Sequence, residues 1–113
     1  FDVIKEGKDA EILEVSDNPE VAVKDADVIM TDTFVSIHNA NPDRIKKFLP
    51  KFQVNQSLMN KSKKDAIFMH CLPAKREQEV TSDVIDGSQS VVWDEAENRL
   101  HVQKALLVYL LGV

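Results

Sequence analysis

The sequence predicts an α/β fold, an open parallel sheet flanked by helices. Short apolar runs with the length of strands alternate along the chain with segments that carry helix-start signals and helical periodicity. Some of these runs are continuously apolar, which is typical of strands buried on both faces of a parallel sheet. Strands that alternate with helices pair in parallel through right-handed crossovers, and 113 residues allow one such domain.

Four strands are predicted along the chain. Residues 11–15 form a short strand, and residues 27–31 form a continuous apolar run that is buried on both faces. Residues 66–70 form a second buried strand, and residues 89–93 form the last one. No internal repeat or low-complexity segment is visible between them, so one sheet is expected.

Asparagine–proline pairs mark the starts of two helices. Asn18 and Pro19 supply an N-cap and a first helical residue, and this helix is expected to run to about Lys24. Residues 41–43 repeat the signal, and the apolar positions 45, 48, 49 and 52 lie on one face of the helix that follows. Pro50 limits or kinks that second helix.

Two further helices are predicted. A short one spans residues 55–61, and the last runs from about Glu95 to the end of the chain. The last helix is expected to turn an apolar stripe toward the core, and its members are Val102, Ala105, Leu106, Tyr109, Leu110 and Val113.

Composition excludes several classes of protein. The chain has 14 Lys and Arg against 19 Asp and Glu, a net charge of −5, which argues against a nucleic-acid partner. The longest apolar stretch, residues 105–111, is too short to cross a bilayer, and no signal peptide is visible, so no membrane partner is expected. One cysteine excludes an internal disulfide and fits a reducing, cytoplasmic location. Because the chain opens on Phe1, we expect a portion of a longer protein.

Reactive side chains follow three of the predicted strands. Asp32 comes directly after residues 27–31. His70 is the last residue of the strand 66–70, and Cys71 comes directly after it. Arg99 lies a few residues beyond the strand 89–93. Ligands of open parallel sheets bind at the carboxyl ends of the strands, so we expect these residues to share one site. Arg99 is expected to point inward near a helix N-terminus, where an anionic ligand is favoured.

Each of these residues also has a purely structural interpretation. Asp32 would cap a turn, Cys71 would be a small buried apolar group, and His70 would be a hydrogen-bonded structural histidine. Arg99 would form a surface ion pair with Glu95. The histidines lack the spacing of metal ligands, a cysteine–histidine protease lacks an oxyanion-hole motif, and no glycine-rich phosphate motif is present. Neither a metal nor an organic cofactor is therefore expected.

Several segments together resemble the aspartate/ornithine carbamoyltransferase family, and ornithine enzymes in particular. The motif HCLPA occupies residues 70–74, and the similarity continues through residues 79–86 and 90–99 and into the closing helix. Upstream, residues 27–36 and the QVN of residues 53–55 also match, so the likeness covers about residues 10 to 112. The resemblance implies the Rossmann-like second domain of a two-domain enzyme, with residues 1–113 as an ornithine-binding domain that lacks its first strand.

The resemblance also implies a partner domain and an assembly. The family's first domain binds carbamoyl phosphate through a Ser-x-Arg-Thr motif, and this sequence contains no such motif. Its own amino-terminal domain is therefore an expected partner, and a homotrimer is expected for the longer protein.

Roles for single residues follow from the resemblance. It implies that Asp32 and Ser36, with Ile37 beside them, hold the amino-acid end of ornithine, and that Cys71 with Asp32 lies near the attacking amine. Main-chain carbonyls of Cys71 and Leu72 would receive the carbamoyl amide. Arg99 would bind carbamoyl phosphate, and His70 is a further candidate.

The implied reaction transfers a carbamoyl group from carbamoyl phosphate to L-ornithine, giving citrulline and phosphate, as in arginine biosynthesis. Ile37 and His38 depart from the family's usual methionine and glycine, which keeps putrescine or an acylated ornithine open as the amine substrate. Aspartate is disfavoured, because aspartate enzymes have proline where Cys71 stands. A second hypothesis is a non-catalytic amino-acid-binding or assembly module.

Overall fold

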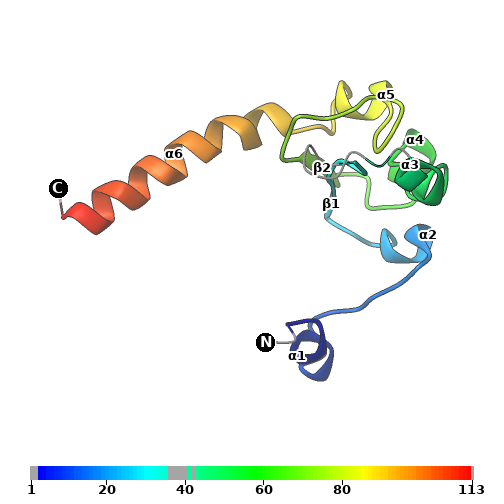
Figure 1. Cartoon of the computed structure of the whole chain (residues 1–113), viewed down its shortest axis with the longest axis horizontal. Coiled ribbons are helices and arrows are strands. Elements are labelled where there is room, and N and C mark those ends of the chain that lie inside the picture. The colour runs from blue at the N-terminus through cyan, green and yellow to red at the C-terminus, as the bar shows by residue number, and fades with distance from the viewer. Residues whose placement is uncertain (1–2, 36–40, 42, 113) are drawn as a thin grey trace.

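The computed structural model describes residues 3–35, 41 and 43–112. Short helices lie near a small parallel sheet, and the first and last helices lie away from it (Figure 1). The predicted α/β class is confirmed. The elements in chain order are α1 (Val3–Asp9), α2 (Pro19–Ala22), β1 (Val28–Thr31), α3 (Asp43–Phe48), α4 (Gln56–Met59), β2 (Ile67–His70), α5 (Ser82–Ile85) and α6 (Val92–Leu111).

The sheet consists of β1 and β2, which pair in parallel with Val28 opposite Ile67 and Thr31 opposite His70. The predicted strand at residues 89–93 is reduced to one bridge, in which Phe68 N–H donates to Gln89 O at 2.8 Å and Val91 N–H donates to Phe68 O at 3.0 Å. The prediction was wrong because α6 already begins at Val92, so the chain leaves the sheet after a single bridge.

The predicted strand at residues 11–15 is also absent from the structure. The backbone N–H groups of Ile12 and Leu13 donate to the carbonyl of Gly7 in α1, at 3.0 and 3.1 Å. Ile12 is 84% exposed. These amides close the end of a helix, α1, that the apolar pattern did not predict, and they are therefore unavailable for pairing with β1.

Two short helices begin at asparagine caps, of which Asn18 was predicted as a cap and Asn55 was predicted as the first residue of a helix. The Asn18 side chain accepts from Glu20 N–H at 3.1 Å to start α2, which ends at Ala22, before the predicted Lys24. The Asn55 side chain accepts from Leu58 N–H at 2.9 Å to start α4. Both contacts satisfy backbone donors that a helix start leaves without partners.

The remaining helices of this part of the chain differ from expectation in detail. α3 ends at Phe48, before Pro50, and Pro42 of its predicted start lies outside the described residues. α5 was not predicted, because four residues carry too little periodicity to be read from sequence.

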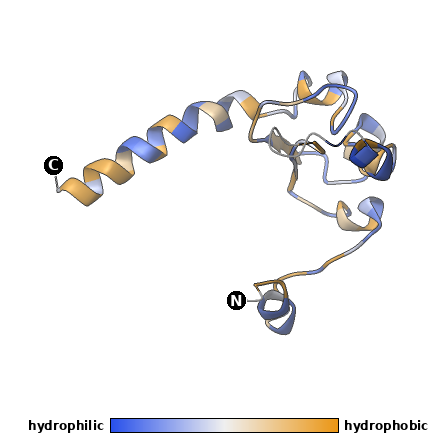
Figure 2. Ribbon diagram, in the orientation of Figure 1, coloured by the Kyte–Doolittle hydropathy of each residue, from blue (hydrophilic) through white to orange (hydrophobic). Residues whose placement is uncertain are grey.

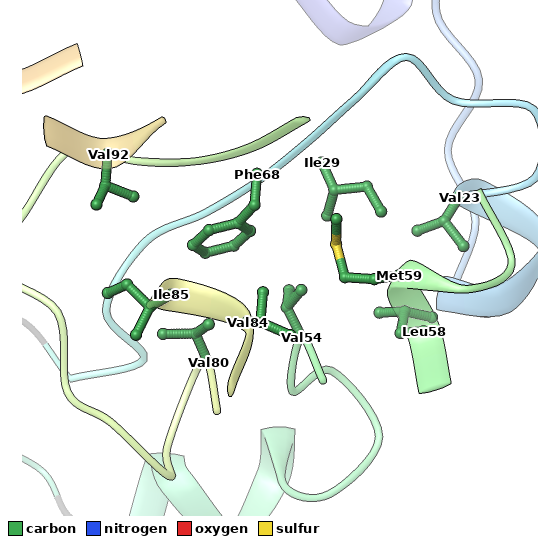
Figure 3. Packing of buried hydrophobic residues seen from close by; sticks show 10 residues of the cluster. All are labelled: Val23, Ile29, Val54, Leu58, Met59, Phe68, Val80, Val84, Ile85 and Val92. Atoms are coloured by element: carbon green, nitrogen blue, oxygen red, sulfur yellow. The ribbon is translucent and has the colours of Figure 1, made fainter. Parts of the chain in front are cut away.

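One apolar cluster holds β1, β2, α4 and α5 together (Figure 3). Phe68 of β2 lies between Ile29 of β1 and the α5 side of the cluster, and it is completely buried. The members of the cluster are Val23, Ile29, Val54, Leu58, Met59, Phe68, Val80, Val84, Ile85 and Val92. Burial of this set fixes the ends of both strands, where the candidate site lies.

Helix α6 extends away from the sheet, and its C-terminal half is predominantly apolar (Figures 1 and 2). The predicted core-facing stripe is wrong for its described members, since Val102, Leu106 and Leu110 are exposed and Tyr109 is 81% exposed. Its last member, Val113, lies outside the described residues. Within the described residues, only the first turn of α6, at Val92, enters the core. The radius of gyration is 16.4 Å, against about 13 Å for a compact chain of this length.

The described helices contain no segment that is both long and apolar enough to cross a membrane.

Candidate functional site

The ends of the two strands place Asp32 and Cys71 next to each other. Thr31 pairs with His70 in the parallel register, so the residues that follow them are also neighbours. The Cys71 thiol donates to Asp32 Oδ1 at 3.5 Å, and Thr33 N–H donates to the same oxygen at 2.7 Å. The order of the strands predicted that Asp32 and Cys71 lie at one edge of the sheet, and the register explains their contact.

Local contacts set the ionisation of this pair in opposite directions. The Thr33 N–H group, followed by the Cys71 thiol, stabilises the Asp32 carboxylate and lowers its pKa. Partial removal of water around the sulfur raises the pKa of Cys71, and the adjacent Asp32 raises it further. Near neutral pH the pair is therefore a protonated thiol beside a carboxylate.

Cys71 is exposed, so its structural interpretation as a buried packing group is wrong. Asp32 accepts from the backbone N–H of the next residue, Thr33, whereas a turn cap would bind the backbone two residues on. The same carboxylate oxygen faces the thiol of Cys71.

His70 lies behind this pair and is completely buried. Its Nδ1 accepts from Leu72 N–H at 2.9 Å, and its own backbone N–H donates to Glu95 Oε2 at 2.9 Å. Its Nε2 lies 3.4 Å from Oε1 of Glu79, which is also completely buried. The predicted structural role of His70 is confirmed by these contacts.

Sequence reasoning missed Glu79 and the contact that Glu95 makes. Glu79 stands in a polar run, residues 75–79, that has the composition of a surface loop, and no spacing singles it out. The structural alternative for Arg99 was an ion pair with Glu95, but the Glu95 carboxylate instead accepts from the backbone N–H of His70 at the end of β2. Both contacts join segments that are distant in sequence.

Arg99 lies in the third turn of α6, not in the first, because the helix begins three residues earlier than predicted. It is exposed and has no ion-pair partner among the described residues. Neither its inward orientation nor its place at a helix N-terminus is therefore correct. Arg99 nevertheless lines an open hollow of about 530 Å³ together with Cys71 and Leu72.

Leu72 has a left-handed backbone, with φ of 54°, between Cys71 and Pro73. Ser36, Ile37 and His38 lie outside the described residues. Among the residues that the structure describes, no group of His, Cys, Asp and Glu side chains is arranged to hold a metal ion. The site is thus built from Asp32, Cys71 and Leu72 at the strand ends, and Arg99 lines the same hollow as Cys71 and Leu72.

Comparison with known proteins gives one consistent family. Residues 2–110 match the model of the aspartate/ornithine carbamoyltransferase Asp/Orn binding domain. An ornithine carbamoyltransferase of Cenarchaeum symbiosum is 61% identical over 98 residues, which are 87% of this chain and 33% of that protein.

Solved structures agree with this result. The ornithine carbamoyltransferase of Pyrococcus furiosus has a TM-score of 0.73 and 55% identity over 80% of this chain and 29% of its own. The anabolic ornithine carbamoyltransferase of Campylobacter jejuni has a TM-score of 0.84 and 36% identity over 96% of this chain and 36% of its own. The chain spans about a third of the length of such relatives. It belongs to the aspartate/ornithine carbamoyltransferase family and corresponds to that family's Asp/Orn binding domain.

Proposed function

We propose that this chain supplies the ornithine side of a carbamoyltransferase site. The reaction transfers the carbamoyl group of carbamoyl phosphate to the side-chain amine of L-ornithine and gives L-citrulline and phosphate. The observation that carries the proposal is the Cys71–Asp32 pair, 3.5 Å apart at the strand ends, beside a hollow that Arg99 also lines. The membership of the family supports it.

The Cys71–Asp32 pair suits an amine nucleophile. Free ornithine carries an ammonium group near neutral pH, and this group must lose a proton before it attacks the carbamoyl carbon. Asp32 is ionised there, so it attracts the ammonium and accepts a hydrogen bond from it. Cys71 has a raised pKa and stays protonated, so it orients the amine without forming a covalent bond to the substrate.

The hollow lined by Cys71, Leu72 and Arg99 suits carbamoyl phosphate. The amine nitrogen forms a bond to the carbamoyl carbon, the bond from that carbon to the phosphate oxygen breaks, and its electron pair leaves with phosphate. The proton of the amine passes to Asp32 or to solvent. The guanidinium of Arg99 stabilises the charge on the leaving phosphate, and the carbonyls of Cys71 and Leu72 orient the carbamoyl amide.

A second domain completes the proposed site. The chain spans about a third of its relatives, and we place the main carbamoyl phosphate contacts on an amino-terminal domain with a Ser-x-Arg-Thr motif. The same proposal makes the longer protein a cytoplasmic homotrimer that serves arginine biosynthesis. Its reading frame upstream of Phe1 is the first observation to make, since the proposal requires that motif there.

Substrate choice is tested by assaying the longer protein with L-ornithine, putrescine and N-acetylornithine in parallel. The expected result is carbamoyl transfer to L-ornithine with the highest kcat/KM. Preferential transfer to putrescine or N-acetylornithine would show that this amine, and not ornithine, is the substrate. No transfer to any of them by the folded protein would support the non-catalytic binding or assembly module.

Arg99→Ala tests the anion contact in the same protein. A charge-assisted contact of this kind is worth about 1.5–3 kcal/mol, so the Kd for carbamoyl phosphate, measured by calorimetry, is expected to rise. Arg44→Ala is a matched control, because Arg44 is a second arginine and lies over the Phe48 ring on α3. An unchanged Kd in folded Arg99→Ala would contradict the assigned role.

A further inference from the structure

The segment that carries Cys71 and Leu72 is held by side chains and not by a strand or helix. Three of its backbone N–H groups donate to side-chain acceptors. His70 N–H binds Glu95, Leu72 N–H binds the ring of His70, and Lys75 N–H binds Glu79. Because backbone donors that leave the sheet need new partners, these side chains determine the path of the segment.

His70 and Glu79 form the buried part of this arrangement. The Nδ1 atom of His70 accepts a hydrogen bond, so the neutral ring carries its proton on Nε2, which faces Glu79 Oε1 at 3.4 Å. Both side chains are completely buried. Neither His70 Nε2 nor Glu79 Oε2 has a hydrogen-bond partner among the described residues, so the ring and the carboxylate meet in an electrostatic contact at 3.4 Å. A buried carboxyl oxygen without a partner costs free energy. An apolar side chain at this position would fill the space without that cost.

We propose that Glu79 is a positioning residue that acts through His70 to hold Cys71 and Leu72 at the site. Glu79 orients the imidazole, the imidazole binds the backbone at Leu72, and Cys71 lies between those two points and faces Asp32. The effect on carbamoyl transfer rests on the proposed function. The effect on the position of the thiol does not.

Cys71 provides a direct measurement, since it is the single cysteine of the chain. Its pKa is raised by partial burial and by Asp32, so a segment that loosens brings the pKa back toward its usual range. A fall of about half a pKa unit increases the reactive thiolate about threefold at pH values well below the pKa. Alkylation by iodoacetamide at fixed pH therefore reports on the segment.

The variants are Glu79→Gln, His70→Asn and the double substitution in the full chain. Glutamine keeps an acceptor for Lys75 N–H, and asparagine keeps an acceptor near the position of Nδ1 but does not reach Glu79. Each single change is expected to increase alkylation about threefold or more. The double variant should equal a single one, because either change already interrupts the same path. A wild-type rate in Glu79→Gln, or additive effects, would overturn the proposal.

Val23→Ala controls for a general loss of stability, because Val23 lies at the opposite side of the cluster from Ile85 and Val80 (Figure 3). The control is expected to lower the melting temperature without changing the alkylation rate. Equal acceleration in Val23→Ala and Glu79→Gln at equal loss of stability would make Glu79 a core residue only.

Amide exchange in the unsubstituted chain tests the proposal even if the variants do not fold. The Leu72 amide lies outside the regular strands and helices, yet it donates to a buried ring nitrogen. It is expected to exchange with solvent at least tenfold more slowly than the amide of Asp32, which is exposed. Equal exchange of the two amides would overturn the proposal. In the longer protein, Glu79→Gln should lower kcat and raise both KM values. A protein with the thiol response but no carbamoyl transfer would refute the proposed function alone.

Discussion

At the scale of single residues, the site depends on a thiol and a carboxylate with opposite ionisation tendencies. Asp32 stays charged because Thr33 N–H and Cys71 donate to it, and Cys71 stays protonated because water is partly removed and Asp32 is close. The pair can therefore attract and orient a cationic amine without supplying a nucleophile of its own.

Cys71→Ser separates an orienting thiol from a structural one. If Cys71 orients the amine, the longer protein with this change should show a higher KM for ornithine and a lower kcat. Binding of carbamoyl phosphate should change less, because serine preserves the main-chain carbonyl. Steady-state kinetics with each substrate varied separately, together with a melting curve, measure this effect. Unchanged kinetics with a lower melting temperature would make Cys71 structural, and complete loss of turnover would indicate a covalent role.

Asp32→Asn tests the electrostatics of the pair in the chain itself. The charge of Asp32 raises the pKa of Cys71, so removing that charge should lower the thiol pKa. The rate of alkylation by iodoacetamide should then begin to rise at a lower pH. Asp43→Asn is a matched control, because Asp43 binds Lys46 on α3 and is not in contact with Cys71. An identical pH profile in Asp32→Asn would show that the two groups do not interact.

At the scale of the elements, short helices rely on their caps because four residues form few internal hydrogen bonds. Asn18 and Asn55 make the same type of contact, but they start helices of different importance. α4 carries the buried side chains of Leu58 and Met59, whereas α2 has no buried residue. The cap of α4 is therefore coupled to the apolar cluster.

Replacing each cap by alanine measures this difference. Asn55→Ala is expected to reduce the free energy of unfolding by about 1 kcal/mol, since it leaves the Leu58 amide without its acceptor. Asn18→Ala removes a similar hydrogen bond from an exposed helix and should have a smaller effect. Urea denaturation followed by circular dichroism gives both values. Equal losses would show that burial beneath the helix does not determine the contribution of a cap.

At the scale of the whole molecule, the chain contributes one side of the proposed site and exposes a long apolar helix face. The hollow beside Cys71 is lined by one exposed arginine of α6, and α6 itself extends beyond the sheet (Figure 1). Both features agree with a chain that spans about a third of its relatives.

The purified 113-residue chain is expected to form no citrulline from ornithine and carbamoyl phosphate. Addition of a separate amino-terminal domain with the Ser-x-Arg-Thr motif should restore part of the activity, because the second set of anion contacts is then present. Citrulline is measured colorimetrically, in a preparation free of host enzyme. Turnover by the chain alone would contradict this division of the site between two domains.

The sequence alone determined the class of fold, the Asn18 cap, the approximate start of α4 and the residues at the ends of β1 and β2. These features depend on local composition and on the order of strands, which a single chain displays directly. The location of Asp32 and Cys71 at the same edge of the sheet could be predicted, because parallel strands end at one edge.

Only the tertiary structure decided where α6 begins and what surrounds His70. The apolar run at residues 89–93 has the composition of a strand, but the chain turns into a helix at Val92 as soon as Phe68 has formed its one bridge. Glu79 is polar and lies in a loop-like run, yet its carboxylate is buried against His70, nine residues earlier. Contacts of this kind depend on how the chain returns on itself, and no local pattern records that path.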